Sequence, residues 1–243
     1  MDDTFWWLPP SYSEEGDRID ELWNAITWIV MVTFVLVQGA IVYAMVRFRR
    51  GRSDRRAHRI LGNYRLELAW TLIPTAILIY VMVASDSLWA ELREQRPSDD
   101  EIAVKIWVDA ERFTWNIHYA GPDKEFGTDD DFDAPNKVIV VPEGRPILIQ
   151  LTSKDVLHSF FVPYLRMKVD AVPGLTTELW FSARSPGPNE KGNYRSLDTD
   201  LQFLCAELCG DLHYNMMGFL WVVPQEEYDS WAAGYAPTPE EDD

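Results

Sequence analysis

The sequence has little positive charge for its size. Its 22 lysines and arginines are outnumbered by 39 acidic residues, which leaves a net charge of −17 over 243 residues. This balance argues against nucleic acid as a partner, because phosphate binding needs a basic surface. It fits either a basic protein partner or a well-solvated acidic surface.

Cysteine and histidine are also scarce, and the chain has no internal repeat. Cys205 and Cys209 are the two cysteines, and a disulfide between them would close a very small loop and stabilise the fold little. Of the four histidines, only His213 lies close to the cysteines in sequence.

Two long apolar stretches stand out against this charged background. They run from about Asn24 to Val46 and from about Leu66 to Trp89. Each holds about 23 residues, enough to cross a hydrocarbon core of roughly 30 Å. The first is too long for the apolar part of a signal peptide and follows acidic residues instead of basic ones. We therefore expect two transmembrane helices within an N-terminal unit of residues 1–95, and not buried helices of a soluble protein.

The connection between the two stretches is strongly basic. From Arg47 to Arg65 it carries eight arginines against one acidic residue, Asp54. A short basic loop belongs on the cytoplasmic side of a membrane. Both termini and everything after about Ala90 are then expected on the periplasmic side of the plasma (inner) membrane, with lipid around the spans. A nucleic-acid or lipid-binding patch is disfavoured, because two spans enclose the loop.

From Ile102 the pattern changes to short β-branched and aromatic runs separated by turn residues. Pro146–Thr152 and Gly218–Val223 are examples. Such a pattern is typical of a β-sandwich or barrel. We expect this outer domain to cover residues 96–228 and an acidic tail to cover residues 229–243.

The densest group of candidate ligands is the segment CAELCGDLHYNM. Cys205 and Cys209 lie four residues apart, His213 follows four residues later, and Met216 three beyond that. Thiolate and thioether favour copper. A single blue-copper centre needs one cysteine, so a second thiolate asks for a second copper ion. The loop supplies one histidine, and His158, just after a predicted strand, is the natural second.

Each of these residue types alone has a simpler explanation. Two cysteines four residues apart could form a disulfide or half of a zinc site. A lone methionine usually belongs to a core. The fixed spacing to His213 makes copper the favoured interpretation.

Three motifs, in the same order, resemble the cytochrome c oxidase subunit II family. CAELCGDLHYNM resembles the family's dinuclear copper A loop, with the pattern C-x-E-x-C-G-x-x-H-x-x-M. DVLHSFFVPYLRMKVDAVPG, which begins at Asp155, resembles its first-histidine segment, and ELAWTLIP, which begins at Glu67, the start of its second membrane helix. The resemblance covers most of residues 20–228. It implies an α+β membrane protein, with a two-helix transmembrane hairpin followed by an all-β cupredoxin-like Greek-key sandwich.

The resemblance implies a role for each matching ligand. Cys205 and Cys209 would bridge two copper ions. His158 and His213 would be terminal nitrogen ligands, and Met216 a weak axial ligand.

Two glutamates are given roles by the same resemblance. Glu207 would offer its backbone carbonyl to copper and its side chain to a magnesium ion shared with subunit I. Glu67 would mark the mouth of a proton pathway into subunit I. Taken alone, Glu67 could be a helix-end carboxylate that faces lipid headgroups.

The implied function is electron transfer within a haem-copper oxidase. Copper would accept electrons from a cytochrome c-type donor and pass them to haem in subunit I, where oxygen is reduced to water with proton translocation. Other oxidase subunits would be further partners.

Two related kinds of protein are disfavoured. A quinol oxidase subunit II lacks copper ligands, whereas this chain has the full set, and a nitrous oxide reductase carries a large catalytic domain for which this chain has no room. A membrane-anchored copper-binding or copper-delivery protein would not need the motif around Glu67.

One aromatic position departs from the family pattern. The family carries W-x-W before an acidic loop, with the first ring accepting electrons. Here Phe113 takes that position and Trp115 matches the second tryptophan. We therefore expect the electron donor to be a dedicated or covalently associated cytochrome in place of a freely diffusing one.

The segment Gly121–Pro135 adds an acidic loop. We expect a basic donor to dock on acidic residues of this loop and on a further carboxylate beside the first-histidine motif. A solvated turn or a cation-binding loop is the alternative. His118 has no motif partner and is expected to be structural. The predicted docking residues are Asp123, Asp129, Asp130, Asp131 and Asp155.

Overall fold

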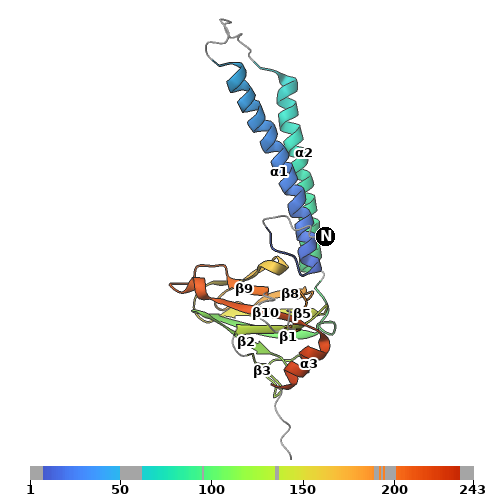
Figure 1. The fold of residues 1–243 in the computed structure, drawn as a ribbon, viewed down its shortest axis with the longest axis vertical. Coiled ribbons are helices and arrows are strands. Elements are labelled where there is room, and N and C mark those ends of the chain that lie inside the picture. Colours follow the sequence, from blue (N-terminus) through green and yellow to red (C-terminus); the bar gives the residue numbers. More distant parts are fainter. Residues whose placement is uncertain are drawn as a thin grey trace, which may run out of the picture. The chain divides into compact units, whose positions relative to one another are not determined.

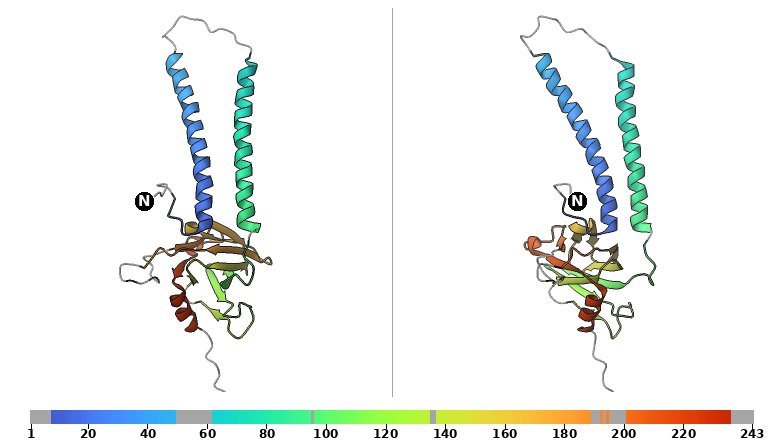
Figure 2. Two further views of the ribbon diagram at one scale, coloured as in Figure 1. Left: turned by 90° about the vertical axis from the view of Figure 1, so that its right-hand side faces the viewer. Right: turned by 45° about the vertical axis from the view of Figure 1, so that its right-hand side comes forward.

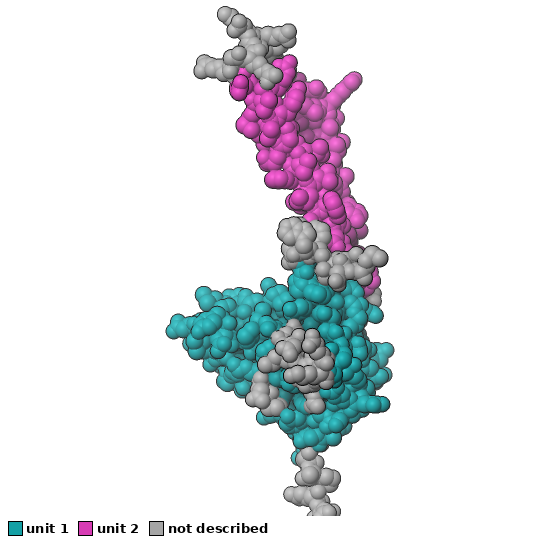
Figure 3. Space-filling view, viewed as in Figure 1, with its two compact units in different colours: residues 1–17, 96–243 teal, residues 18–95 magenta. Residues whose placement is uncertain are grey.

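A computed structural model gives the structure of the chain. It describes residues 8–49, 62–94, 96–134, 137–188, 192, 194 and 201–235. Most of the basic loop, most of the segment 189–200 and the end of the acidic tail therefore lie outside the described residues. The chain forms two compact units, residues 18–95 and residues 1–17 with 96–243 (Figure 3).

The first unit is a pair of antiparallel helices, α1 (Glu14–Arg47) and α2 (Tyr64–Glu94) (Figure 1). Both predicted spans lie within them. Their most apolar windows have mean hydropathies of 2.3 and 1.9, and none of the residues in these windows is buried. Helices of this length and composition satisfy every backbone hydrogen bond internally, which is what a hydrocarbon core requires. Figure 2 shows the helices side by side, and Arg18 and Glu91 join them through two hydrogen bonds of 2.8 Å.

The second unit is a β-sandwich. Within the described residues, its strands form two five-stranded sheets. The first sheet has the order β3 (Phe132–Asp133), β2 (Thr114–Tyr119), β1 (Val104–Glu111), β5 (Pro146–Ser153) and β8 (Thr177–Ser182). The second has the order β4 (Val138–Pro142), β10 (Met217–Val223), β9 (Leu201–Cys205), β6 (His158–Val162) and β7 (Met167–Ala171). The predicted cupredoxin-like sandwich is confirmed.

Alternating side chains give each sheet one buried face. In β1, every second residue from Val104 to Ala110 is buried, and the residues between them are partly exposed. Because successive side chains of a strand point to opposite faces, this pattern places one apolar face against the other sheet. Phe160, Phe181 and Phe203 are among the largest side chains in the resulting core.

A short helix closes one end of the sandwich. α3 (Gln225–Ala233) runs across the boundary expected at residue 228. Its Trp231 is only 9% exposed and packs against Tyr119 and Phe132, at ring-centroid distances of 5.2 and 5.7 Å. The start of the expected acidic tail is therefore part of the sandwich core.

The segment before α1 also belongs to the sandwich. The backbone N–H of Tyr12 donates to the carbonyl of Tyr164 (2.9 Å), and Ser13 forms a bridge with Ala183. The units thus divide after Asp17, whereas the sequence pattern placed residues 1–95 together. Pairing between segments so far apart in the chain leaves no local sequence signal.

Candidate metal centre

Three strands of the second sheet bring the predicted ligands together. β6 begins with His158, and β9 ends with Cys205. The two strands are antiparallel neighbours, with Phe160 opposite Cys205. After Cys205 the chain forms a loop that returns to β10 at Met217, and the Cys205 N–H donates to the Met216 carbonyl (2.9 Å), which closes the loop.

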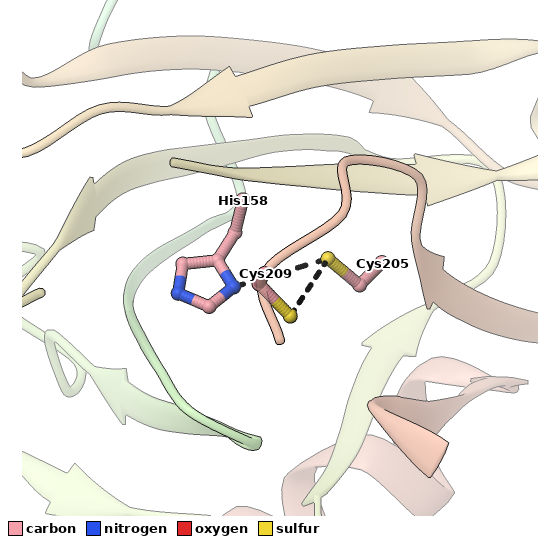
Figure 4. A group of neighbouring side chains, drawn as sticks. All are labelled: His158, Cys205 and Cys209. Carbon is pink, nitrogen blue, oxygen red and sulfur yellow. Dashed lines mark hydrogen bonds between the residues drawn. The ribbon is translucent and has the colours of Figure 1, made fainter. Parts of the chain in front are cut away.

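The ligand atoms face a common point (Figure 4). The sulfurs of Cys205 and Cys209 are 3.9 Å apart, and His158 Nδ1 lies 3.8 Å from Cys205 Sγ. The donor atoms of these three buried residues all lie within 4.8 Å of one another.

Two of the remaining predicted ligands lie beside Cys209 and the third lies beside Cys205. His213 Nδ1 is 3.6 Å and Met216 Sδ is 3.7 Å from Cys209 Sγ. The Glu207 carbonyl oxygen is 3.1 Å from Cys205 Sγ. The six predicted ligand residues therefore converge, and each sulfur has its own imidazole nitrogen beside it.

The two cysteines are free thiols. Their separation is almost twice the length of a disulfide bond, about 2.05 Å. Burial, together with the adjacent Cys205 thiol, raises the pKa of Cys209 to about 11. Two thiolates this close and this buried need a cation between them, because charge repulsion and desolvation both oppose ionisation. The sulfur-rich donor set fits copper.

His158 is held in one orientation. Its ring is fully buried, and Nε2 lies 2.9 Å from Asp155 Oδ1. With the proton on Nε2, Nδ1 keeps its lone pair toward the cysteines, as a metal ligand requires. The Trp115 ring packs edge-on against His158 at 6.1 Å, and Trp115 Nε1 donates to the Met216 carbonyl (3.5 Å).

Asp155 is ionised more readily than an ordinary aspartate. Desolvation opposes ionisation, but hydrogen bonds from His158 and from the backbone N–H groups of Arg112 and Val156 outweigh it and lower the pKa to about 2. The sequence motif placed Asp155 among the docking residues. That motif gave no indication of the hydrogen bonds that Asp155 accepts from His158, Arg112 and Val156.

Phe113 lies directly beside the loop of predicted copper ligands, residues 205–216, here called the copper loop. A Cβ added to Gly210 would come within 3.0 Å of the Phe113 ring, so the ring rests against the backbone one residue after Cys209. Phe113 itself is partly exposed. The ring therefore lies between the surface and the ligand loop, and its role in electron entry stays a prediction.

The acidic loop lies at the other end of the β1–β2 hairpin from Phe113. The hairpin turns at residues 112–113, and the loop follows Tyr119 at the end of β2. Some of its carboxylates bind the loop itself: Asp123 accepts from Glu125 N–H (2.8 Å), and Asp131 accepts from Gly127 N–H (2.6 Å). A hydrogen bond from the Thr128 hydroxyl lowers the pKa of Asp130. Part of the acidic charge therefore shapes the turn.

His118 has partners that the sequence did not reveal. Its ring lies between Asp133, with Nδ1 2.5 Å from Oδ1, and Asp109, with Nε2 3.8 Å from Oδ2. These contacts tie β3 to the outer face of β1 and β2, in keeping with the structural role expected for His118.

Apolar side chains surround the copper loop on the surface. Leu208 is 78% exposed, Leu212 45% and Tyr214 79%. Exposed apolar groups gathered around buried polar ligands are typical of a surface that a partner covers. Sequence reasoning did not single out these residues, although three apolar residues in one ligand loop would have been a usable signal.

Glu67 lies in the first turn of α2. Its carboxylate accepts a hydrogen bond from the Asn63 N–H (3.2 Å), and its backbone carbonyl accepts one from the Thr71 hydroxyl (2.9 Å). It is exposed at the start of a span, where a partner subunit could reach it. Its role in proton uptake stays a prediction.

Comparison with known proteins agrees with this geometry. Two family models match the chain: cytochrome C oxidase subunit II, transmembrane domain, over residues 4–88, and cytochrome C oxidase subunit II, periplasmic domain, over residues 123–222. Together they cover about three quarters of the chain.

Individual relatives carry the same description. Cytochrome c oxidase subunit 2 of a Synechocystis species is 29% identical over 96% of this chain and 77% of its own length. That of Alkalihalophilus pseudofirmus is 32% identical over 88% of this chain and 57% of its own length. A crystal structure of the periplasmic domain of subunit II of cytochrome oxidase from Bradyrhizobium japonicum matches 58% of this chain and 96% of that domain, with 26% identity and a TM-score of 0.45.

The helical hairpin, the sandwich and the matched family models agree with one another. The protein is a membrane protein with a periplasmic domain, and its family implies a copper centre. The chain belongs to the cytochrome c oxidase subunit II family, whose members are subunits of haem-copper oxidases, an oxidoreductase complex.

Proposed function

We propose that this chain accepts electrons for a haem-copper cytochrome c oxidase through a dinuclear copper A centre. The observation that carries the proposal is the pair of buried, unbridged sulfurs 3.9 Å apart, each with an imidazole nitrogen beside it. Two copper ions held by both thiolates would share one electron between the two metals. This sharing would keep the geometric change on oxidation and reduction small.

The protein's own residues hold this centre in place. Cys205 and Cys209 would bridge the ions, His158 and His213 would each bind one, and Met216 and the Glu207 carbonyl would complete the two coordination spheres. His158 and Cys205 stand on paired strands, and Trp115 anchors the Met216 carbonyl. Donors fixed by strands need little reorganisation when the charge of the site changes.

Different exposed groups around the site are assigned to the electron donor and to the acceptor. Phe113 is partly exposed against Gly210 and offers a ring to a cytochrome c-type donor. His213 is more exposed than the fully buried His158 and lies among the apolar residues Leu208 and Tyr214. We assign that apolar side to subunit I, to which electrons pass for the reduction of oxygen.

Several further parts of the proposal rest on the family resemblance or on the charge pattern of the sequence. The Glu207 side chain is exposed, as a ligand to a magnesium ion shared with subunit I would have to be before assembly. Glu67 would begin a proton pathway, and Asp123, Asp129, Asp130 and Asp131 would attract a basic donor. Both termini would lie on the periplasmic side.

Purification of the tagged chain from native membranes tests the proposal. The expected result is co-purification of a haem-bearing membrane subunit, with oxygen consumption that depends on a reduced cytochrome c-type donor. A chain that binds copper but never associates with a haem-bearing subunit would instead be a copper-binding or copper-delivery protein. The electron-transfer proposal would then be wrong.

A further inference from the structure

The connection between β5 and β6 contains a carboxylate whose two oxygens serve different parts of the molecule. Asp155 lies three residues before His158. Its Oδ1 accepts from His158 Nε2 (2.9 Å) and from the Val156 N–H (2.6 Å). Its Oδ2 accepts from the Arg112 N–H (3.0 Å) and lies 3.6 Å from Arg112 Nε.

The hydrogen bond to Oδ1 fixes the tautomer and orientation of the His158 imidazole. A carboxylate on Nε2 fixes the proton there, directs Nδ1 to the cysteines and makes the ring a better donor. Because His158 is fully buried against Trp115, the ring has one orientation, and Asp155 is the polar group that selects it.

The contacts of Oδ2 hold the Arg112–Phe113 turn in place. Arg112 directly precedes Phe113, and a Cβ on Gly210 would meet the Phe113 ring at 3.0 Å and Arg112 Cδ at 3.7 Å. Holding the Arg112 N–H therefore holds the Phe113 ring against the copper loop. The carboxylate links a predicted copper ligand in the second sheet with the predicted electron-accepting ring, which lies in the turn between β1 and β2 of the first sheet.

We propose that Asp155 is a positioning residue that fixes His158 and the Arg112–Phe113 turn in one arrangement. This inference rests on the proposed function, because it requires copper at the cysteines. It is separate from the docking role that the sequence suggested for Asp155, whose side chain is 31% exposed. The Arg112 guanidinium beside Oδ2 also offsets the negative charge that a basic donor would meet.

The test uses the full chain, assembled in its oxidase and loaded with copper, with Asp155→Asn and Asp155→Ala. Asparagine has one acceptor oxygen, so its amide nitrogen must face either His158 Nε2 or the Arg112 N–H. Both of these groups are donors, so one of the two hydrogen bonds is lost. We expect both variants to change the copper EPR and visible spectra and to shift the reduction potential. Copper retention against a chelator should fall about 10- to 100-fold, the usual cost of losing a hydrogen-bonding partner of a metal ligand.

Two further variants separate positioning from docking. Asp129→Asn removes one exposed carboxylate from the predicted docking set and should leave the spectra and potential unchanged. Arg112→Gln keeps the backbone N–H and should have a smaller spectral effect than Asp155→Ala. If the Asp155 variants kept wild-type spectra, potential and copper retention and only raised the KM for the donor in a salt-dependent manner, Asp155 would be a docking residue and the inference would be overturned.

The two proposals can fail separately. If wild-type protein gives no two-copper spectrum, the proposed function is wrong, and the inference fails with it. If wild-type protein gives that spectrum and Asp155→Ala matches it in every readout, only the role of Asp155 is wrong.

Discussion

At the scale of single residues, Cys205 and Cys209 are the predicted metal ligands and make up a small part of the fold. Cys205 and Cys209 are buried, but Ala206, Glu207, Leu208 and Gly210 around them are exposed. Cys205, Cys209 and Met216 belong to the hydrophobic core, but most of that core is formed by strand residues of both sheets. Metal binding and folding are therefore separable by substitution.

Cys209→Ser should abolish the dinuclear centre while the sandwich still folds. Serine is close in size to cysteine, and burying its hydroxyl without a partner costs about 1–3 kcal/mol. EPR of the copper-loaded variant tests the first part, and thermal unfolding followed by circular dichroism tests the second. Loss of folded structure would contradict this account of the loop.

Gly210→Ala should slow electron uptake through Phe113. The backbone of Gly210 has φ +142°, and the new Cβ would press on the Phe113 ring at 3.0 Å. Backbone strain alone costs about 1–3 kcal/mol. Stopped-flow reduction by the donor measures uptake.

The matched control for this substitution is Gly144→Ala, in the turn between β4 and β5. Gly144 also has a positive φ (+66°), but nothing lies within 4 Å of an added Cβ. It should reproduce the strain and leave electron uptake unchanged. Equal rates for Gly210→Ala and wild type would show that the Phe113 contact does not matter.

At the scale of elements, one tyrosine joins the two sheets of the sandwich. The Tyr119 hydroxyl, from β2, donates to the Val140 carbonyl (2.9 Å) and accepts from the Val140 N–H (2.8 Å) on β4. Burial raises the pKa of Tyr119 well above its ordinary value of 10.0. The folded state therefore binds this proton more tightly than the unfolded chain does.

Tyr119→Phe should destabilise the sandwich and weaken its sensitivity to alkali. Leaving the Val140 groups without this partner costs about 1–3 kcal/mol near neutral pH. In wild type, the raised pKa means that stability is fully present below pH ~10 and is lost as the pH rises beyond it. The variant should show a shallower loss, measured as the free energy of unfolding in urea from pH 7 to 11. An unchanged pH profile would exclude Tyr119 as a source of the alkaline loss.

The elements differ in how far the sequence predicted them. Both spans followed from local patterns, as did strands such as β5 and β10, which contain the runs Pro146–Thr152 and Gly218–Val223. The spacing of Cys205, Cys209, His213 and Met216 pointed to a metal-binding loop, whereas Glu207 entered through the family resemblance alone. The packing of Trp231 against Tyr119 was not predictable, because a short helix with one buried tryptophan has no strong periodic signal. The hydrogen bonds of Asp155 to His158 and Arg112 were also hidden, since they join segments that only the fold brings together.

At the scale of the whole molecule, α1 and α2 carry the exposed apolar surface of a membrane anchor. Trp28, Phe34 and Leu36 of α1 are each more than half exposed, as are Trp70 and Leu78 of α2. In water this surface would be costly, at about 25 cal/mol per Å² of apolar area. Lipid and partner subunits are the surroundings that make the hairpin stable.

The orientation of the chain can be tested by chemical labelling. In the copper-loaded chain, whose Cys205 and Cys209 would be held by copper, we expect Ser53→Cys, in the basic loop, to react with a membrane-impermeant thiol reagent only from the cytoplasmic side. Asp129→Cys, in the acidic loop, should react only from the periplasmic side. Labelling of intact spheroplasts, compared with inverted vesicles, distinguishes the two sides, and the reverse pattern would contradict the predicted topology.

The central claim is that two copper ions share the thiolates of Cys205 and Cys209. EPR spectroscopy of the copper-loaded wild-type chain tests it most directly. A delocalised mixed-valence pair predicts a multi-line spectrum and a purple colour. A single four-line spectrum of an isolated blue-copper ion would contradict the dinuclear centre.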